Sequence, residues 1–259
     1  MSNQQRAILE VDQLSVSYGH FQAVRQVSFT VASGEIFGLL GPNGAGKTST
    51  LSAIEGLLRP QGGQINVAGF SILDQPLYAK ANMGVQLQST SFQAELNVAE
   101  IIRLFAGIYG KEMTPAEVEE KLVEINLQDS GTKRFGQLSG GQQQRVSLVI
   151  STIHDPQLVL LDEPTTGLDP QSRRQLWDRI EAIKSKGHAV LLTTHSMEEA
   201  EAVCDRIAII DHGRVIAIDT PEALIAAHRN DPDVIAVSRK GKITLEDVFI
   251  GLTGRAVRS

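Results

Sequence analysis

The sequence holds a single cysteine, no run of eighteen apolar residues and no basic-then-apolar pattern at its start. One cysteine cannot form a disulfide within the chain, which indicates a reducing compartment such as the cytoplasm. The other two absences lead us to expect neither a membrane-spanning helix nor a secretion signal. Cys204 lies in a stretch with apolar spacing, so we expect its side chain to be buried rather than reactive.

Positive charge is also scarce. The 259 residues include 24 basic and 30 acidic side chains, which gives a net charge of −6. This balance argues against free binding to nucleic acid or to bare anionic lipid. With 42 % hydrophobic and 21 % charged residues, the chain suits one globular domain, or two closely joined domains, with a sizeable core.

Strand-like and helix-like patterns alternate along most of the chain. Residues 8–18 alternate like a half-buried strand, whereas residues 35–40 form a continuous apolar run that suits a strand buried on both faces. Residues 158–162, 189–194 and 206–211 also have strand patterns. Helices are predicted from Lys47, over residues 170–185 and from Met197. This alternation predicts an α/β fold with a parallel sheet covered by helices on both faces.

The pattern becomes helical throughout residues 97–154, which we interpret as an inserted helical subdomain. Thr114, Pro115 and Glu117 form a helix-start signature within it. Near the other end of the chain, apolar side chains at helical spacing predict an amphipathic helix, namely Leu245, Val248, Phe249 and Leu252. Residues 230–242 are the stretch that we expect to be most exposed or flexible.

The segment "GPNGAGKT" fits the phosphate-loop pattern, with a buried strand before it and a helix after it. Backbone N–H groups of such a loop face a polyphosphate, and the helix N-terminus adds partial positive charge. Lys47 is expected to reach the β and γ phosphates, and the Thr48 hydroxyl to bind Mg²⁺. The alternative is a glycine-rich turn with an unrelated lysine. The predicted nucleotide-binding residues here are Gly41, Pro42, Asn43, Gly44, Ala45, Gly46, Lys47, Thr48 and Ser49.

Polar side chains follow two apolar strands. Asp162 ends the strand in "LVLLDEP", where its carboxylate can hold Mg²⁺, and Glu163 can polarise an attacking water. A helix cap or a solvated turn is the structural alternative for such a pair. His195 follows "VLLTT", where it can hydrogen-bond a γ-phosphate or serve as an ordinary polar residue. We predict Glu163, His195 and Lys47 as the catalytic residues.

The stretch "LSGGQ", residues 138–142, begins a helix with two glycines, which are poor helix formers. Ser139 and Gln142 fit a capping box. The helix start, with Gly140 and Gly141, offers a second anion site. Both phosphate-binding helix ends can serve one nucleotide inside one chain, or two chains can each offer one end.

This combination of motifs resembles the ATP-binding cassette family, the nucleotide-binding subunits of ABC transporters, over about residues 7–220. "GPNGAGKT", "LVLLDEP" and "LSGGQ" are similar to its Walker A, Walker B and signature motifs. The resemblance implies a P-loop NTPase core with a mostly parallel sheet, an antiparallel β subdomain and a helical subdomain at about residues 89–154. We therefore divide the chain into a nucleotide-binding domain, residues 1–222, and a short C-terminal extension, residues 223–259.

The resemblance also assigns roles to further residues. "GLD" is similar to the family's D-loop, which adds Asp169, and His195 is similar to its switch histidine. "MGVQLQ" is similar to the strand that carries the Mg²⁺-contacting glutamine, which implies Gln88, although Gln86 lies two residues earlier. Tyr18 in "VSYG" matches the aromatic residue that stacks on adenine, and a place in the core is the alternative. The implied Mg²⁺ ligands are Thr48, Gln88 and Asp162.

ATP and Mg²⁺ are thus the implied ligands. The family's subunits pack head-to-tail, as homodimers or heterodimers, so that the signature helix of one faces the ATP of the other. The implied partner is a separate integral membrane permease, which would place the chain at the inner face of the membrane without inserting it in lipid or binding it to nucleic acid. The segment after Gln88, "STSFQAELNVAE", is implied to lie near the permease. The tail "TLEDVFIGLTGR" resembles a motif of ATPases in ABC-2 type export systems, which favours export.

Two other functions remain to be compared with this one. A soluble ABC ATPase that acts on a ribosome or on nucleic acid usually has two cassettes or long coiled-coil insertions, and the net acidity also opposes it. A kinase or GTPase with the same phosphate loop does not explain "LSGGQ". The cargo cannot be inferred, because the cargo-facing surface belongs to another chain.

Overall fold

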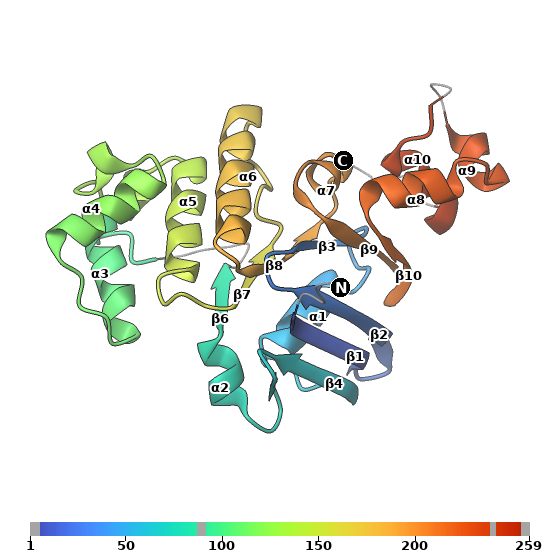
Figure 1. Ribbon diagram of the computed structural model, residues 1–259, viewed down its shortest axis with the longest axis horizontal. Helices are drawn as coiled ribbons and strands as arrows, with labels where there is room; N and C mark the ends of the chain where they lie inside the picture. Colours follow the sequence, from blue (N-terminus) through green and yellow to red (C-terminus); the bar gives the residue numbers. More distant parts are fainter. Residues whose placement is uncertain (1–5, 87–91, 239–241, 255–259) are drawn as a thin grey trace, which may run out of the picture.

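A computed structural model describes residues 6–86, 92–238 and 242–254 (Figure 1). Its larger sheet has six strands in the order β10-β9-β3-β8-β7-β6, and neighbours are parallel except β10 and β9. Every residue of β3, β7 and β8 is buried, as their apolar sequences predict. The bounds are Ile36–Leu40 for β3, Met83–Gln86 for β6, Leu158–Asp162 for β7, Ala189–Thr194 for β8, Arg206–Asp211 for β9 and Arg214–Asp219 for β10.

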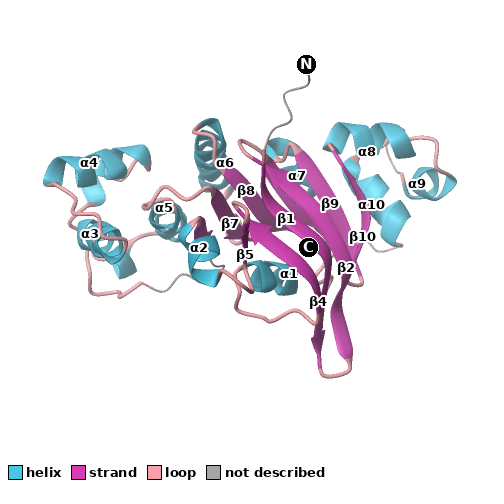
Figure 2. Ribbon diagram, turned by 60° about the horizontal axis from the view of Figure 1, so that its bottom comes forward, coloured by secondary structure: helices cyan, strands magenta, loops and turns pink. Residues whose placement is uncertain are grey.

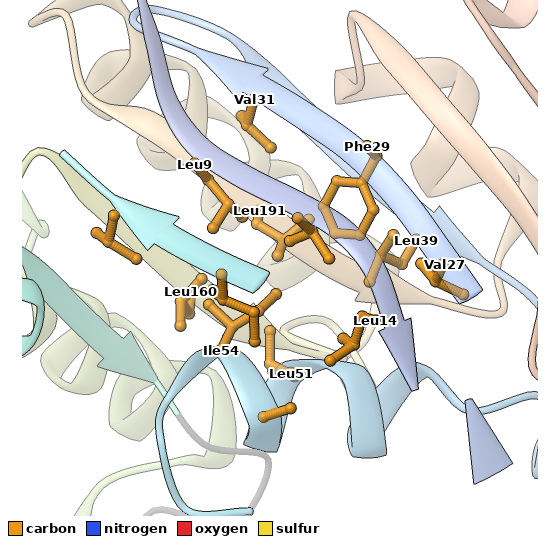
Figure 3. Packing of buried hydrophobic residues seen from close by; sticks show 14 of the residues in the cluster. Leu9, Leu14, Val27, Phe29, Val31, Leu39, Leu51, Ile54, Leu160 and Leu191 are labelled. Carbon is orange, nitrogen blue, oxygen red and sulfur yellow. The ribbon is translucent and has the colours of Figure 1, made fainter. Parts of the chain in front are cut away.

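The second sheet is antiparallel, in the order β2-β1-β4-β5. Its strands are β1 (Ala7–Tyr18), β2 (Phe21–Ala32), β4 (Gly62–Val67) and β5 (Phe70–Ser71). Helix α1 (Lys47–Ile54) contributes to the core that the two sheets share. Figure 3 shows Leu9, Leu14 and Phe29 of the antiparallel sheet beside Leu51 and Ile54 of α1. The alternating pattern of β1 and β2 thus supplies one apolar face to this core.

A second apolar cluster covers the other face of the large sheet. Cys204 belongs to it and is buried, as predicted. The helices that contribute buried side chains include α6 (Pro170–Ser185), α7 (Met197–Val203), α8 (Pro221–His228) and α10 (Leu245–Thr253). Leu245, Val248 and Phe249 are fully buried, which confirms the amphipathic helix near the end of the chain.

Three helices form a cluster of their own, with two short 3-10 turns at Gln128–Ser130 and Phe135–Gln137. They are α3 (Val98–Ile108), α4 (Pro115–Glu124) and α5 (Gly140–Ser151). Thr114 caps α4 with the capping box that the sequence predicts. Figures 1 and 2 show α3 to α5 at one end of the molecule and α8 to α10 at the other. The short helix α2 (Pro76–Ala81) precedes β6.

The expectation for residues 230–242 holds in part, and residues 239–241 lie outside the described ranges. Most of the described residues there are exposed or half-buried, but α9 (Pro232–Val237) lies within them and Val234 is fully buried. A Cβ atom at Gly251 of α10 would lie 2.9 Å from the Cα atom of Val234. The close contact between these two helices explains the burial, which the polar flanks of the segment concealed. Among the helices of the described ranges, none combines the length and apolar character that a bilayer span requires.

Candidate active site

The phosphate-loop segment joins β3 to α1, as its sequence predicts. Gly44 and Gly46 have positive φ angles of 81° and 105°. A Cβ atom at Gly41 would lie 2.4 Å from the Ile210 carbonyl oxygen, and one at Gly46 would lie 2.5 Å from the Ala23 carbonyl oxygen. The chain's own backbone therefore excludes larger residues at these two positions.

The start of α1 is open to an anion. The helix has no side-chain cap and no acidic residue in its first turn. Its first N–H groups therefore have no partner within the helix and are free to bind phosphate. Thr48 is exposed in this turn, and Asn43 and Gly44 are exposed just before it.

Lys47 is buried at the base of the loop, with 5 % of its surface exposed. Its Nζ atom donates to the carbonyl oxygens of Gly41, at 2.7 Å, and Pro42, at 3.2 Å, and lies 3.6 Å from Oε1 of Glu163. Burial lowers the pKa of Lys47, and the charge of Glu163 opposes that shift. The ammonium group is therefore held near the site by neutral carbonyl oxygens. Charged phosphate oxygens, which accept stronger hydrogen bonds, can replace them.

Glu163 follows β7 in a left-handed conformation, with φ at 45°. Its Oε2 atom lies 3.3 Å from Nδ1 of His195 and accepts a hydrogen bond from Thr166, at 3.2 Å. The structure thus brings together Lys47, Glu163 and His195, the three predicted catalytic residues, although they are far apart in the sequence. A carboxylate in contact with both a lysine and a histidine can accept a proton or orient a water.

Asp162 is 7 % exposed, and its Oδ1 atom accepts a hydrogen bond from the Thr193 hydroxyl at 2.5 Å. Thr193 was not predicted as a site residue, because its partner lies 31 positions away and only the pairing of β7 with β8 brings the two together. The signal in the sequence is a polar pair, Thr193 and Thr194, that ends an otherwise apolar strand.

The donor atoms suit Mg²⁺. Thr48 offers a hydroxyl and Asp162 a carboxylate, which are hard oxygen ligands. Within the described ranges, no group of three or more His, Cys, Asp or Glu side chains could hold a metal ion. Mg²⁺ at nucleotide sites commonly uses only one or two carboxylates and completes its shell with phosphate and water. Gln88, the third predicted ligand, lies outside the described residues.

Gln86 has a different environment. It is 2 % exposed, and its Nε2 atom donates to Oε1 of Gln144 in α5 at 2.5 Å. The Oε1 atom of Gln86 is buried and has no hydrogen-bond partner among the described residues. The side chain thus connects β6 to α5, the helix that begins with "GGQ".

Tyr18 ends β1 beside the phosphate loop. Its side chain is 51 % exposed, so the alternative of a core position is excluded. The hydroxyl oxygen lies 3.3 Å from Oγ of Ser49, which is the third residue of α1. An exposed ring next to the phosphate loop is free to stack on a planar base.

The signature helix α5 begins with the predicted capping box. The Ser139 hydroxyl accepts from the Gln142 N–H at 3.3 Å, and Oε1 of Gln142 accepts from the Ser139 N–H at 2.9 Å. A Cβ atom at Gly141 would lie 2.8 Å from Oγ of Ser172 in α6, whereas one at Gly140 would meet nothing within 4 Å. Packing inside the chain therefore requires the second glycine but not the first.

Asp169 caps helix α6. Its Oδ1 atom accepts from the N–H groups of Gln171 and Ser172, and its Oδ2 atom accepts from the Ser172 hydroxyl at 2.6 Å. The hydrogen bonds from Ser172 lower the pKa of Asp169. The predicted nucleotide-binding aspartate thus has a structural task within the chain, and it anchors the serine that packs on Gly141.

Comparisons with known proteins agree with this geometry. Residues 24–166 match the family described as "ABC transporter". The Nod factor export ATP-binding protein I of Paraburkholderia xenovorans (strain LB400) is 39 % identical over 251 residues, which cover 96 % of this chain and 82 % of that protein. The protein of the same name from Rhizobium johnstonii (strain DSM 114642 / LMG 32736 / 3841) is 41 % identical over 216 residues, which cover 82 % of this chain and 69 % of that protein.

Solved structures give the same result. The structure of an ATP binding subunit of an ABC transporter has a TM-score of 0.79 and 31 % identity, and the match covers 95 % of this chain and 99 % of that one. An ATP-binding cassette of an ABC transporter in its ADP conformation has a TM-score of 0.77 at 23 % identity, covering 89 % of this chain and 98 % of that one. The second likeness concerns the fold alone.

Proposed function

Because this chain belongs to the ABC transporter family and is one of its ATP-binding subunits, an ATPase, we propose that it hydrolyses ATP with Mg²⁺ to drive export through a separate membrane permease. The observation that carries the chemical part is the position of Glu163. It contacts Lys47 and His195 beside the phosphate loop, where helix α1 begins without a side-chain cap. That arrangement supplies a phosphate-binding cation and a carboxylate for the attacking water.

In this mechanism the amides of the phosphate loop and Lys47 bind the β and γ phosphates, while Tyr18 stacks on the adenine. Thr48, Asp162 and Gln88 would hold Mg²⁺, and the ion would supply positive charge that neutralises the phosphates. Entry of the phosphates draws Lys47 from the Gly41 and Pro42 carbonyl oxygens, and Glu163 is then free to polarise the water. His195 hydrogen-bonds the γ-phosphate and responds to its loss.

Two cassettes complete the site. Gly140 supports this part of the proposal, because a Cβ atom there would meet none of the described residues within 4 Å, so that packing among them does not call for a glycine. In a head-to-tail pair, the start of α5 approaches the nucleotide of the partner, and Ser139, Gly140, Gly141 and Gln142 meet its γ-phosphate, with Asp169 beside the junction. The partner is a second copy or a related cassette.

The family and the names of the relatives, which describe export proteins, support a membrane partner. Strand β6 leads into residues 89–100, which we propose as the coupling segment, although residues 89–91 lie outside the described ranges. Exposed apolar side chains lie on and near α2, which precedes β6, namely Leu57, Leu77 and Tyr78. Contact with the permease would hold the chain at the inner face of the membrane.

The test of the chemical part is Glu163→Gln. The amide keeps the size of the side chain but cannot take a proton, so turnover should fall by about 10²–10⁴-fold while ATP still binds. Glu119→Gln, a change of the same kind at an exposed position of α4, serves as the matched control. Hydrolysis by the Glu163 variant at the wild-type rate would remove this residue from the mechanism. The test of the membrane part is to purify this chain from detergent-solubilised membranes. An integral membrane permease should co-purify with it.

A further inference from the structure

We propose that Thr193 is a positioning residue that fixes Asp162 and the backbone of Glu163 together, so that the metal ligand and the water-activating carboxylate keep one arrangement. This inference rests on the proposed function of those two carboxylates. Thr193 lies in β8, the strand between β7 and β3, and it pairs in register with Asp162. Its side chain is fully buried.

The hydroxyl group of Thr193 uses both of its hydrogen-bonding capacities on this site. It donates its proton to Oδ1 of Asp162, at 2.5 Å, and it accepts the N–H of Glu163, at 3.0 Å. A hydroxyl has one proton to donate and two lone pairs to accept with, so one atom can join both neighbours. The Thr193 carbonyl oxygen accepts the same N–H at 3.2 Å.

The first bond determines how the Asp162 carboxylate is oriented. Within the described ranges, no other hydrogen bond reaches that carboxylate. Four apolar residues precede it in β7 and offer it no hydrogen-bonding side chain. With Oδ1 engaged by Thr193, Oδ2 is the oxygen left for a metal or its water. Hydrogen bonds of this kind orient metal ligands, and their loss typically lowers metal affinity or activity by about 10–100-fold.

The second bond stabilises an unfavourable backbone. Glu163 has a positive φ of 45°, which a residue with a side chain rarely adopts. Such conformations persist only where the surroundings hold them. The hydroxyl and the carbonyl oxygen of Thr193 both hold the Glu163 N–H, and the resulting turn directs the carboxylate toward Lys47 and His195. One buried hydroxyl thus acts on both carboxylates.

The next residue of β8 provides a matched control. Thr194 is also buried, but its hydroxyl accepts the Ser196 N–H at 2.9 Å and contacts neither carboxylate. Thr193→Val and Thr194→Val remove the same group from neighbouring positions of one strand. Thr193→Ser keeps the hydroxyl, and Thr193→Ala is a second way to remove it should the valine disturb folding.

The experiment measures binding of the non-hydrolysable analogue AMP-PNP, with Mg²⁺ and again in EDTA, and takes the ratio of the two affinities as the contribution of the metal. Thr193→Val and Thr193→Ala should lower that ratio by about 10-fold or more, with the affinity in EDTA unchanged. Thr193→Ser and Thr194→Val should keep the wild-type ratio. A wild-type ratio in Thr193→Val, an equal loss in Thr193→Ser, or an equal loss of affinity in EDTA would overturn the inference.

Asp162→Asn separates this inference from the proposed function. It should lower the same ratio at least as much as Thr193→Val. If it does not, the assignment of Asp162 to Mg²⁺ is wrong and the inference fails with it. If Asp162→Asn lowers the ratio but Thr193→Val does not, only the role of Thr193 fails.

Discussion

Glycines stand directly before helix α1 and at the first two positions of helix α5, but their surroundings differ. The start of α1 has no side-chain cap, and its Gly41 and Gly46 are required by contacts with the chain's own backbone. The start of α5 is capped by Ser139, and Gly140 there has no neighbour that would exclude a side chain. Contacts inside the chain therefore account for the glycines at the first start, whereas no contact among the described residues accounts for Gly140 at the second.

This difference separates two reasons for a glycine at a functional site. At Gly41 an added side chain would meet the chain's own backbone, so the residue reports on packing. At Gly140 no contact among the described residues excludes a side chain, which is why we propose that this glycine serves a ligand or another subunit. Gly141 belongs to the first kind, because Ser172 of α6 excludes a Cβ atom there. Adjacent glycines in one motif thus serve different purposes.

The sharpest test of the comparison mixes two inactive variants. Lys47→Ala disables the first helix start and Ser139→Arg blocks the second. If each site uses both starts from one chain, the mixture stays inactive. If sites form across a head-to-tail pair, random exchange makes about half of the pairs mixed, and each mixed pair has one intact site, so about a quarter of all sites recover. ATPase activity of the mixture measures this.

Two sites that work only jointly would hide such recovery. The control therefore uses differently tagged copies of the two variants, each also carrying Glu163→Gln, and measures their ATP-dependent association in a pull-down. Failure of the tagged copies to associate at saturating ATP would contradict a role of the second helix start in a neighbouring chain.

The next largest effect is expected at the first helix start. Gly41→Ala places a Cβ atom against the Ile210 carbonyl oxygen, which the sheet cannot easily move. Overpacking of this kind costs about 3 kcal/mol of unfolding free energy, and ATP binding should be lost with the loop conformation. Urea unfolding and nucleotide binding measure the two effects. Normal stability in this variant would show that the loop relaxes and that the fold does not demand the glycine.

The C-terminal ends of α1 and α5 can be compared as well, because residues at both ends line one cavity of about 330 Å³. The buried Glu55 directly follows helix α1, and His154 follows the end of α5. Burial, and then the negative charge of Asp162, raise the pKa of Glu55 to about 7, while Lys80 opposes the shift. Burial lowers the pKa of His154. At this cavity, the surroundings thus favour the neutral forms of both Glu55 and His154.

The shift at Glu55 predicts a pH dependence of stability. A carboxyl whose pKa is raised on folding binds more protons in the folded state, so stability falls as pH rises from about 4.5 to about 7. Glu55→Gln removes this loss and should raise the unfolding free energy at pH 8 by on the order of 2 kcal/mol, with little change near pH 5. Urea unfolding at both pH values, with Glu119→Gln as control, tests it. A gain of equal size at both values would rule out titration as the cause.

The smallest expected effect distinguishes the two glycines of α5. Gly140→Ala should stabilise the isolated chain by about 0.4–1 kcal/mol, because the position is helical and free of contacts, yet it should lower ATPase activity by hindering the approach of a partner. Gly141→Ala should destabilise the chain through the clash with Ser172. Thermal unfolding and ATPase assays of both variants measure this. Full ATPase activity of a stabilised Gly140→Ala variant would contradict the close approach of a partner to this position.

The sequence predicts some parts of the fold much better than others. The strands at residues 158–162, 189–194 and 206–211 and the helix Pro170–Ser185 have the predicted bounds, because continuous apolar runs and a proline at the first helical position are strong local signals. Strand β10 was not predicted, since its side chains alternate between exposed and half-buried on an edge of the sheet. Helices α2 and α9 have six residues each, too few for a helical period to be visible.

Prediction of the site from the sequence has the same limit, because it too depends on local patterns. Phosphate-loop and strand-end residues are recognisable because each motif is contiguous. The contact of Lys47 with Glu163, and the hydrogen bonds of Thr193, depend on strand order, which local patterns do not contain. For the same reason Ser172, which explains Gly141, could not be inferred. The roles of Tyr18, Asp169 and Gln88 toward a nucleotide stay predictions.

The buried cysteine has a practical consequence for labelling chemistry. Cys204 packs under β3, where a Cβ atom at Gly38 would lie 2.8 Å from its sulfur, and burial raises the pKa of its thiol well above the ordinary value. A maleimide or disulfide reagent reacts with thiolate, so the folded protein should be almost inert to it. A fluorophore or spin label can therefore be attached to a cysteine engineered on the surface while Cys204 is retained. The labelling rate of the native thiol, in turn, measures how often this core opens, because the thiol can react only when α7 separates from the sheet.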